Sequence, residues 1–188
     1  MLTITQAGFA EQTITKSRFI AMALHCADER EVGAALRAFA AQHPTAHHLA
    51  YAFRLNTEQG IVPRFSDAGE PSGTAGMPVL KLIEWRDLIY VCVAVIRYYG
   101  GINLGTGGLA RAYGGTAKLA LDATKSADFV KMQTIQLTIN YKQMDAVNHA
   151  LSKCNGSILD KAFNEQIDLQ ILLPAIEAAN FVKRFKPF

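Results

Sequence analysis

The spacing of hydrophobic and polar residues predicts strands and then a helix in the first part of the chain. Residues 12–25 alternate and are rich in Thr, Ile and Phe, which is typical of one or two strands. In residues 28–44, apolar side chains recur every three or four positions after Asp28, and acidic residues occupy the first turn. This pattern predicts an amphipathic helix with Asp28 as its N-cap and Pro44 as its terminator.

Residues 46–55 predict a strand with two unlike faces. His47 shares one face with the large apolar side chains of the segment, whereas His48, the alanines and Arg54 share the other. We therefore expect the large side chains to face the core, with His47 at the end of the core face. His48 shares its face with Arg54 and is a candidate for the polar surface.

The middle of the chain combines an irregular segment with regular elements. Residues 56–74 lack a periodic pattern and are expected to be irregular, whereas residues 76–85 predict a short helix and residues 88–96 a buried strand. Residues 97–115, RYYGGINLGTGGLARAYGG, hold seven glycines and lead into a predicted helix that ends near Asp122.

The pattern changes after residue 123 and indicates a second domain. Residues 124–131 are the best candidate for a boundary, and a strand, a helix, a hairpin and a last helix are predicted beyond them. We therefore expect one domain at residues 1–126 and a β-α-β-β-α domain at residues 131–188.

Composition is typical of a cytoplasmic protein. The 188 residues are half hydrophobic, which is enough to bury a core, and the three cysteines lack CxxC spacing and are expected to be reduced thiols. The amino terminus lacks a signal-peptide pattern and no apolar run approaches the roughly 20 residues of a membrane span, so we expect no membrane partner. The formal charge of +3 excludes a DNA-compacting protein, and any contact with nucleic acid needs a local patch.

Two explanations compete for the glycine-rich segment, tight packing and a binding surface. Glycine inside a regular element costs about 0.5–1 kcal/mol relative to alanine, so a cluster needs a cause. Thr106 can cap a helix whose first turn contains Gly107 and Gly108, leaving backbone N–H groups open to phosphate. The lysine of a P-loop is missing, which disfavours a nucleotide-hydrolysing site. Three explanations of the glycine-rich segment remain: a tight turn, a phosphate or nucleic-acid surface, and a nucleotide pocket.

Residues 64–76, RFSDAGEPSGTAG, are the second dense stretch of polar residues. In one interpretation Asp67 caps a turn and Glu70 pairs with a local arginine; in the other, this loop and the glycine-rich segment form one functional face. Asp67 and Glu70 are three residues apart, but a calcium or magnesium ion needs further oxygen ligands, and the sequence offers no candidates for them. We therefore predict no metal site. We also expect neither carboxylate to have a shifted pKa.

Catalytic chemistry has little support in the sequence. His47 and His48 are adjacent, and a strand directs adjacent side chains to opposite faces, so they do not chelate one ion together. No nucleophile has a Ser-His-Asp or Cys-His context. We therefore name no catalytic residue and no cofactor.

Three segments occur in the order and spacing of a known signature: HHLAYAFR at residues 47–54, RFSDAGEPSGTAGMPVL at residues 64–80 and VIRYYGGINLGTGGLARAYGG at residues 95–115. Through them the chain resembles the IMPACT family, in its bacterial YigZ-like branch, over about residues 17–121. The resemblance implies an α+β protein whose amino-terminal domain has the fold of the second domain of ribosomal protein S-five and of domain IV of elongation factor G, followed by a small ferredoxin-like domain. Eukaryotic relatives regulate translation by competing for the activator of the kinase that senses uncharged tRNA, and the resemblance implies no reaction.

The chain departs from the family pattern at three places. Leu49 stands where family members often have cysteine, and Ala68 replaces the second aspartate of the SDDGEPSG pattern. A metal or catalytic role that depends on those residues does not carry over. A ferredoxin-like fold also needs a strand after its last helix, and the chain ends at KRFKPF, so the carboxy-terminal domain is expected to lack that strand.

Basic residues near the glycine-rich segment provide a candidate RNA contact. On the predicted helix Arg111 and Lys118 are seven residues apart and share a face, and Lys125 continues the row if the helix does. Phosphate contacts give affinity without sequence specificity, and exposed aromatic rings stack on bases. The aromatic residues nearby are Tyr98, Tyr99 and Tyr113.

We therefore expect a non-enzymatic, translation-associated regulatory protein that binds RNA or the ribosome. The alternatives are a protein-binding module that competes for a translation-factor or kinase-activator partner, and a hydrolase of unrecognised type; the oligomeric state is left open. The residues nominated for the partner surface are His48, Arg54, Arg64, Asp67, Glu70, Arg97, Tyr98, Gly107, Gly108, Arg111 and Lys118.

Overall fold

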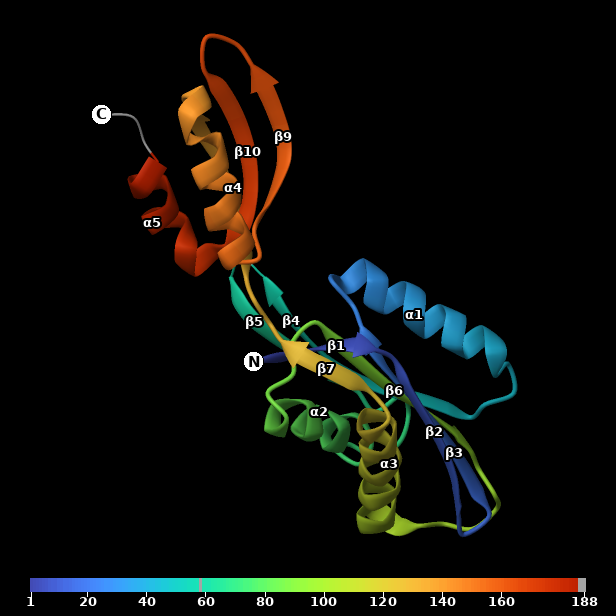
Figure 1. Cartoon of the computed structure of the whole chain (residues 1–188). Coiled ribbons are helices and arrows are strands. Elements are labelled where there is room, and N and C mark those ends of the chain that lie inside the picture. The colour runs from blue at the N-terminus through green and yellow to red at the C-terminus, as the bar shows by residue number, and fades with distance from the viewer. Residues whose placement is uncertain (58, 186–188) are drawn as a thin grey trace. The chain divides into compact units, whose positions relative to one another are not determined.

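The computed structural model of the chain describes residues 1–57 and 59–185. The chain divides into two compact units, Met1–Phe129 and Val130–Phe188. Each is described by itself, as unit 1 and unit 2, and Figure 1 labels their elements.

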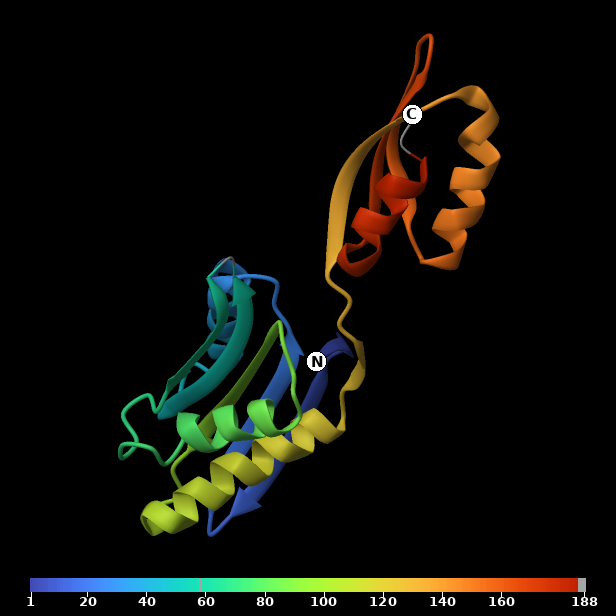
Figure 2. The same cartoon turned by 90° about the vertical axis from the view of Figure 1, so that its left-hand side faces the viewer.

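A five-stranded antiparallel sheet lies at the centre of unit 1. Its strands, in spatial order, are β2 (Gly8–Ile14), β3 (Ser17–His25), β6 (Val91–Tyr98), β4 (His48–Thr57) and β5 (Gly60–Ser66). Helix α1 (Glu29–Gln42) covers one face, and the helices α2 (Gly76–Trp85) and α3 (Gly105–Asp122) lie side by side on the other (Figures 1 and 2). The central strands β3 and β6 are therefore buried on both faces, whereas the outer strands β2 and β5 are partly exposed.

Several predicted elements of unit 1 are confirmed. The strand pattern of residues 12–25 corresponds to the hairpin of β2 and β3. Asp28 caps α1, since its carboxylate accepts a hydrogen bond from the N–H of Glu31 at 2.8 Å. The predicted helix at residues 76–85 and the helix ending at Asp122 are also present.

Strand β4 differs from its prediction because both of its faces are buried. The large side chains, such as Tyr51 and Phe53, pack on the side of α1 as expected. Ala50 and Ala52 are completely buried against the core formed with α2 and α3. Small side chains on this face let two helices approach the sheet closely, which an alternating pattern of large residues does not reveal.

Three strands lie outside the predicted elements. Residues 56–74, expected to be irregular, contain β5, whose Pro63 is tolerated because β5 is the edge of the sheet. The strands β1 (Leu2–Gln6) and β7 (Lys125–Asp128) pair with each other from opposite ends of unit 1. Lys125 therefore belongs to a strand, and the proposed basic row on α3 does not continue to it.

Unit 2 has the predicted β-α-β-β-α order. Its elements are β8 (Met132–Ile139), the short 3-10 helix η1 (Tyr141–Gln143), α4 (Met144–Lys153), β9 (Ser157–Phe163), β10 (Ile167–Pro174) and α5 (Ala175–Phe185). The sheet order is β8-β10-β9, and the helices α4 and α5 contribute to one core with it. The expected absence of a strand after α5 concerns residues 186–188, which lie outside the described residues.

Within residues 1–57 and 59–185, no helix is long and apolar enough to cross a membrane.

The first glycine of the glycine-rich segment, Gly100, packs against the turn between β2 and β3. Thr15 and Lys16 form the two-residue turn between β2 and β3, and both have left-handed backbones, with φ of 45° and 66°. Gly100 lies against this turn, so closely that a Cβ on it would lie 2.1 Å from the carbonyl carbon of Lys16. At Gly107, by contrast, a Cβ would meet only the guanidinium end of Arg111, at 3.4 Å. Close packing therefore requires glycine at position 100, whereas it does not require glycine at position 107.

We predict that Gly100→Ala lowers the free energy of unfolding by about 1–3 kcal/mol, because a backbone segment must move to accept the methyl group. Gly107→Ala is expected to leave it unchanged or raise it by up to about 1 kcal/mol, since alanine is the better helix former. Urea unfolding of both variants at pH 7 measures the difference, and equal losses in the two variants would contradict this division.

Candidate functional site

A cleft of about 480 Å³ opens where β4, β6, the loop after β5 and the start of α3 meet. The loop at residues 64–76 and the glycine-rich segment both contribute to it, as one of the alternatives from the sequence requires. The residues that line the cleft are His47, His48, Glu70, Pro71, Arg97, Tyr99, Asn103, Leu104, Gly105, Thr106 and Leu109.

A buried ion pair forms the inner wall of the cleft. One carboxylate oxygen of Glu70, Oε1, accepts hydrogen bonds from Arg97 Nη1 at 2.7 Å and from the Tyr113 hydroxyl at 2.8 Å. The side chains of Glu70 and Arg97 are only 5% and 6% exposed, and Tyr113 is fully buried. Burial, together with the hydrogen bond to Glu70, raises the pKa of Tyr113 above its ordinary value. Arg97 and Tyr113, considered for an exposed basic and aromatic surface, are thus mainly internal.

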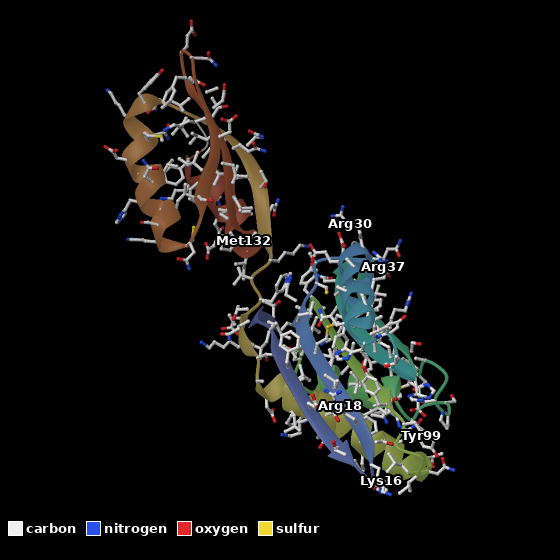
Figure 3. All side chains as sticks on the ribbon, turned by 90° about the vertical axis from the view of Figure 1, so that its right-hand side faces the viewer. Lys16, Arg18, Arg30, Arg37, Tyr99 and Met132 are labelled. Atoms are coloured by element: carbon white, nitrogen blue, oxygen red, sulfur yellow. The ribbon has the colours of Figure 1, made fainter. Side chains whose placement is uncertain are left out.

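The guanidinium of Arg97 has further contacts along the cleft. Nη2 donates to the hydroxyl of Ser17 at 3.4 Å, whereas Nε is buried and has no hydrogen-bond partner among residues 1–57 and 59–185. The guanidinium also lies over the rings of Tyr99 and Phe19, at 5.1 and 5.7 Å from their centroids. Tyr99 is itself exposed, at the end of unit 1 that carries Lys16 (Figure 3). The sequence does not point to Ser17, because a single serine after a turn has no distinctive pattern.

The two histidines reach the cleft with different partners. His47 Nδ1 accepts a hydrogen bond from the N–H of Tyr99 at 3.2 Å, and His48 Nδ1 donates to the carbonyl of Ala68 at 2.9 Å. His48 Nε2 lies 3.9 Å from Glu70 Oε1. In the part of the chain that the structure describes, no group of three His, Cys, Asp or Glu residues is placed to hold a metal ion.

Asp67 holds the loop at residues 64–76 in shape. Its Oδ1 accepts hydrogen bonds from the N–H groups of Ala75 and Gly76 at 3.0 and 2.8 Å, and its Oδ2 accepts one from Gly73 at 2.8 Å. Burial acts to raise the pKa of Asp67, but these backbone donors outweigh it and hold the pKa below its ordinary value. The expectation of an unshifted pKa is therefore wrong for Asp67, and the interpretation that Asp67 caps a turn is confirmed.

The first turn of α3 is open to the cleft. The helix begins at Gly105 with Leu104 as N-cap, and the side chain of Leu104 makes no capping hydrogen bond. Thr106, predicted as the cap, lies inside the first turn instead. Gly105 has φ of +67°, and Gly105, Thr106 and Gly107 are exposed. The N–H groups of this turn have no partner within the helix and the helix dipole makes them attractive to an anion.

Three nominated residues lie outside the cleft. Arg54 donates to Asp87 and to the carbonyl of Leu88, near the end of α2. The hydroxyl of Tyr98 lies 3.0 Å from Nδ1 of His43, on the α1 side of the sheet, and Arg64 is exposed on the edge strand β5. The structure therefore does not bring these three residues together with the others.

The nominated residues Gly108, Arg111 and Lys118 continue along α3. Arg111 is exposed, and with Gly108 it lines a neighbouring hollow of about 420 Å³. Lys118 is also exposed and donates to Asp122 at 2.7 Å, one turn further along α3. Asp122 also accepts a hydrogen bond from Arg86, and an exposed pair such as Lys118–Asp122 contributes little to stability.

Known proteins resemble this chain over most of its length. A sequence profile of the Impact N-terminal domain matches residues 15–121. The IMPACT family member YigZ of Escherichia coli (strain K12) is 34% identical over 178 residues, which are 94% of this chain and 87% of the relative; YvyE of Bacillus subtilis (strain 168) is 30% identical over 179 residues, 95% and 82% of the two chains.

Solved structures also resemble the fold. A crystal structure of a hypothetical protein, 32% identical, superposes with a TM-score of 0.72 over 97% of this chain and 89% of its own. The structure of the two-domain translational regulator Yih1 matches 62% of this chain and 47% of its own at 23% identity, with a TM-score of 0.41, a likeness too low to carry over a fold or a partner.

We predict that Asp67→Asn lowers the free energy of unfolding at pH 7 by about 1–2 kcal/mol, because the amide removes the charge and places N–H donors opposite the N–H of Gly73. A carboxyl whose pKa is lowered on folding stabilises the folded state above its unfolded pKa and loses that effect as the pH falls through the folded pKa. The difference between wild type and variant should therefore shrink below about pH 4, the ordinary range of aspartate. Urea unfolding from pH 7 to pH 3 measures it, with Asp128→Asn as the exposed control on β7. A difference independent of pH would contradict the role of the charge.

We predict that Arg97→Met costs about 3–5 kcal/mol of the free energy of unfolding, because it leaves the Glu70 carboxylate buried and uncompensated. Combining it with Glu70→Gln should restore part of this loss, since the second change removes the unpaired charge. Unfolding of the single and double variants forms a double-mutant cycle, and purely additive losses would show that the ion pair is not coupled.

Proposed function

Because the chain belongs to the IMPACT family, we propose that it is a cytoplasmic, non-enzymatic regulatory protein of translation that binds RNA or the ribosome through unit 1. The contact we propose runs from the first turn of α3, at the cleft, to the exposed basic residues Arg111 and Lys118 on the same helix.

The observation that carries this proposal is the open first turn of α3. Its exposed residues include Gly105 and Gly107, and a side chain at Gly107 would meet no backbone. Packing therefore does not explain the glycine at this position. A phosphate group can approach the backbone N–H groups only where side chains are small. Binding of a phosphate therefore explains the glycine at position 107.

Arg97 supports an anionic ligand at the same place. It lines the cleft, and its Nε is a buried donor that finds no partner in the part of the chain that the structure describes. Buried donors normally have a partner, and a bound oxyanion would supply one. The neighbouring ring of Tyr99 is exposed and offers a surface on which a base can stack.

The charges of the cleft favour binding over catalysis. The charges of Glu70 and Arg97 neutralise each other, and His48 Nδ1 already donates a hydrogen bond to the carbonyl of Ala68. The attraction for a polyanion then comes from the helix N-terminus and from the exposed cations of α3. Contacts of this kind recognise the phosphate backbone and not the sequence of bases.

We also propose specific folds for the two units. For unit 1 it is that of the second domain of ribosomal protein S-five, which the family resemblance implies. For unit 2 it is a ferredoxin-like fold. The spatial order of first, third and second strand, with both helices packed into one core, supports this assignment for unit 2.

We predict that affinity for single-stranded RNA falls steeply as salt rises, and that Arg111→Ala combined with Lys118→Ala makes this dependence shallower. Each phosphate contact to a single strand contributes about 0.7 to the slope of log K against log salt, so losing two contacts should lower the slope by about 1.4. Fluorescence anisotropy with a labelled mixed-sequence RNA of about 12 nucleotides, titrated at several salt concentrations, measures both slopes.

Two further variants sharpen this experiment. Arg30→Ala combined with Arg37→Ala removes the same charge from α1, on the opposite face of the sheet (Figure 3), and should leave the slope unchanged. Gly107→Ala should bind RNA several-fold more weakly at unchanged stability, because its methyl group stands in the path of the phosphate. Absence of RNA binding at low salt would refute the proposal and favour the protein-binding alternative.

A further inference from the structure

Trp85, the only tryptophan of the chain, is 79% exposed at the end of α2. Burying a large aromatic side chain stabilises a protein, so a tryptophan that stays in water forgoes that stabilisation. It lines two separate hollows of unit 1, with volumes of about 490 and 630 Å³. This exposed ring is not part of the cleft at the start of α3.

The smaller hollow is a groove between α2 and α3, which lie side by side in Figures 1 and 2. Its lining includes the apolar side chains of Pro78 and Leu82, and Gly114 and Gly115 contribute no side chain from α3. These glycines belong to the signature segment but take no part in the contact proposed above. The groove gives an apolar surface beside the exposed indole.

The charged residues that line this groove are all basic. They are Lys81, Arg111 and Lys118, and no carboxylate lines the groove in the described residues. Lys81 lies one helical turn from Trp85 on α2, and the other two cations face it from α3. The charges therefore complement an anionic partner that also presents flat or apolar groups.

Two kinds of partner have this chemistry, single-stranded RNA and an acidic peptide. The position of the cations favours RNA. Arg111 and Lys118 are seven residues apart, about 10 Å along the axis of α3, and the same row begins at the open first turn. A chain with regularly repeated phosphates contacts every point of such a row, and the exposed indole adds a stacking surface for an unpaired base.

We propose that Trp85 is the stacking platform for an unpaired base of single-stranded RNA, with the neighbouring phosphates on the basic residues of the α2–α3 groove. This inference rests on the proposed function and specifies its ligand, because a base inside a duplex is already stacked and cannot cover the indole. RNA would then follow α3 from its first turn to the groove.

The emission of Trp85 provides a direct test, since no other tryptophan contributes. A single-stranded RNA octamer of mixed sequence should quench the emission in a saturable manner, with the same midpoint as binding followed by anisotropy. An octamer with the same backbone but without bases should bind with little quenching. A duplex of the same sequence should also quench little.

Variants of Trp85 separate stacking from general binding. Trp85→Leu is expected to lower the affinity for the octamer about tenfold, whereas Trp85→Tyr should retain most of it, because tyrosine still offers an aromatic face. Both variants should unfold at the same urea concentration as the wild type, since the side chain is largely exposed.

Each other outcome overturns the inference in a distinguishable way. If the octamer binds, but without quenching and equally well to Trp85→Leu, the stacking role is refuted and the proposed function stands. If the wild type binds no RNA, both are refuted. If only a glutamate-rich peptide quenches the emission, the groove is a docking site for an acidic protein segment and not for RNA.

Discussion

The hydrogen-bonded ion pair between Glu70 and Arg97 is the constraint on which the shape of the cleft depends. It joins the loop after β5 to the central strand β6, and the hydroxyl of Tyr113 ties α3 to the same carboxylate oxygen. Burying two charges is expensive, and such a pair adds little net stability over a well-packed apolar core. Its effect is geometric. The loop cannot move away from β6 without leaving a buried charge unpaired, and the middle of α3 cannot move away from the loop without breaking the hydrogen bond of the Tyr113 hydroxyl.

A second constraint, close backbone packing, acts at the same place. The turn between β2 and β3 touches Gly100 so closely that no side chain fits there, and the hydroxyl of Ser17 accepts hydrogen bonds from both Gly100 and Arg97. The chain therefore passes from β6 to α3 along a fixed path. This path explains why the first turn of α3 lies in the cleft with its N–H groups exposed, in place of being capped by its own Thr106.

Local patterns in the sequence predicted what depends on neighbours along the chain. The caps and periodicity of α1, the end of α3 and the order of elements in unit 2 follow from short-range rules, and so does the role of Asp67 in its turn. What could not be predicted depends on distant partners. Arg97 looks like a free cation until the fold brings Glu70 to it from 27 residues away, and the alanines of β4 look like an outer face until α2 packs against the strand.

Because Arg97 is buried and paired with Glu70, it cannot be the main source of the attraction for the polyanion in the proposed function. An arginine in a cleft would by itself suggest a strong phosphate site, but Glu70 balances the charge of Arg97, and its Nε is left without a partner among the described residues. The helix N-terminus supplies a partial charge that acts only over short distances. Long-range attraction must therefore come from the exposed cations along α3 and α2, which are spread along a line and screened by salt. Under the proposed function, such a surface would attract a flexible, repeating anion first, and the backbone donors of the cleft would then bind one of its phosphates.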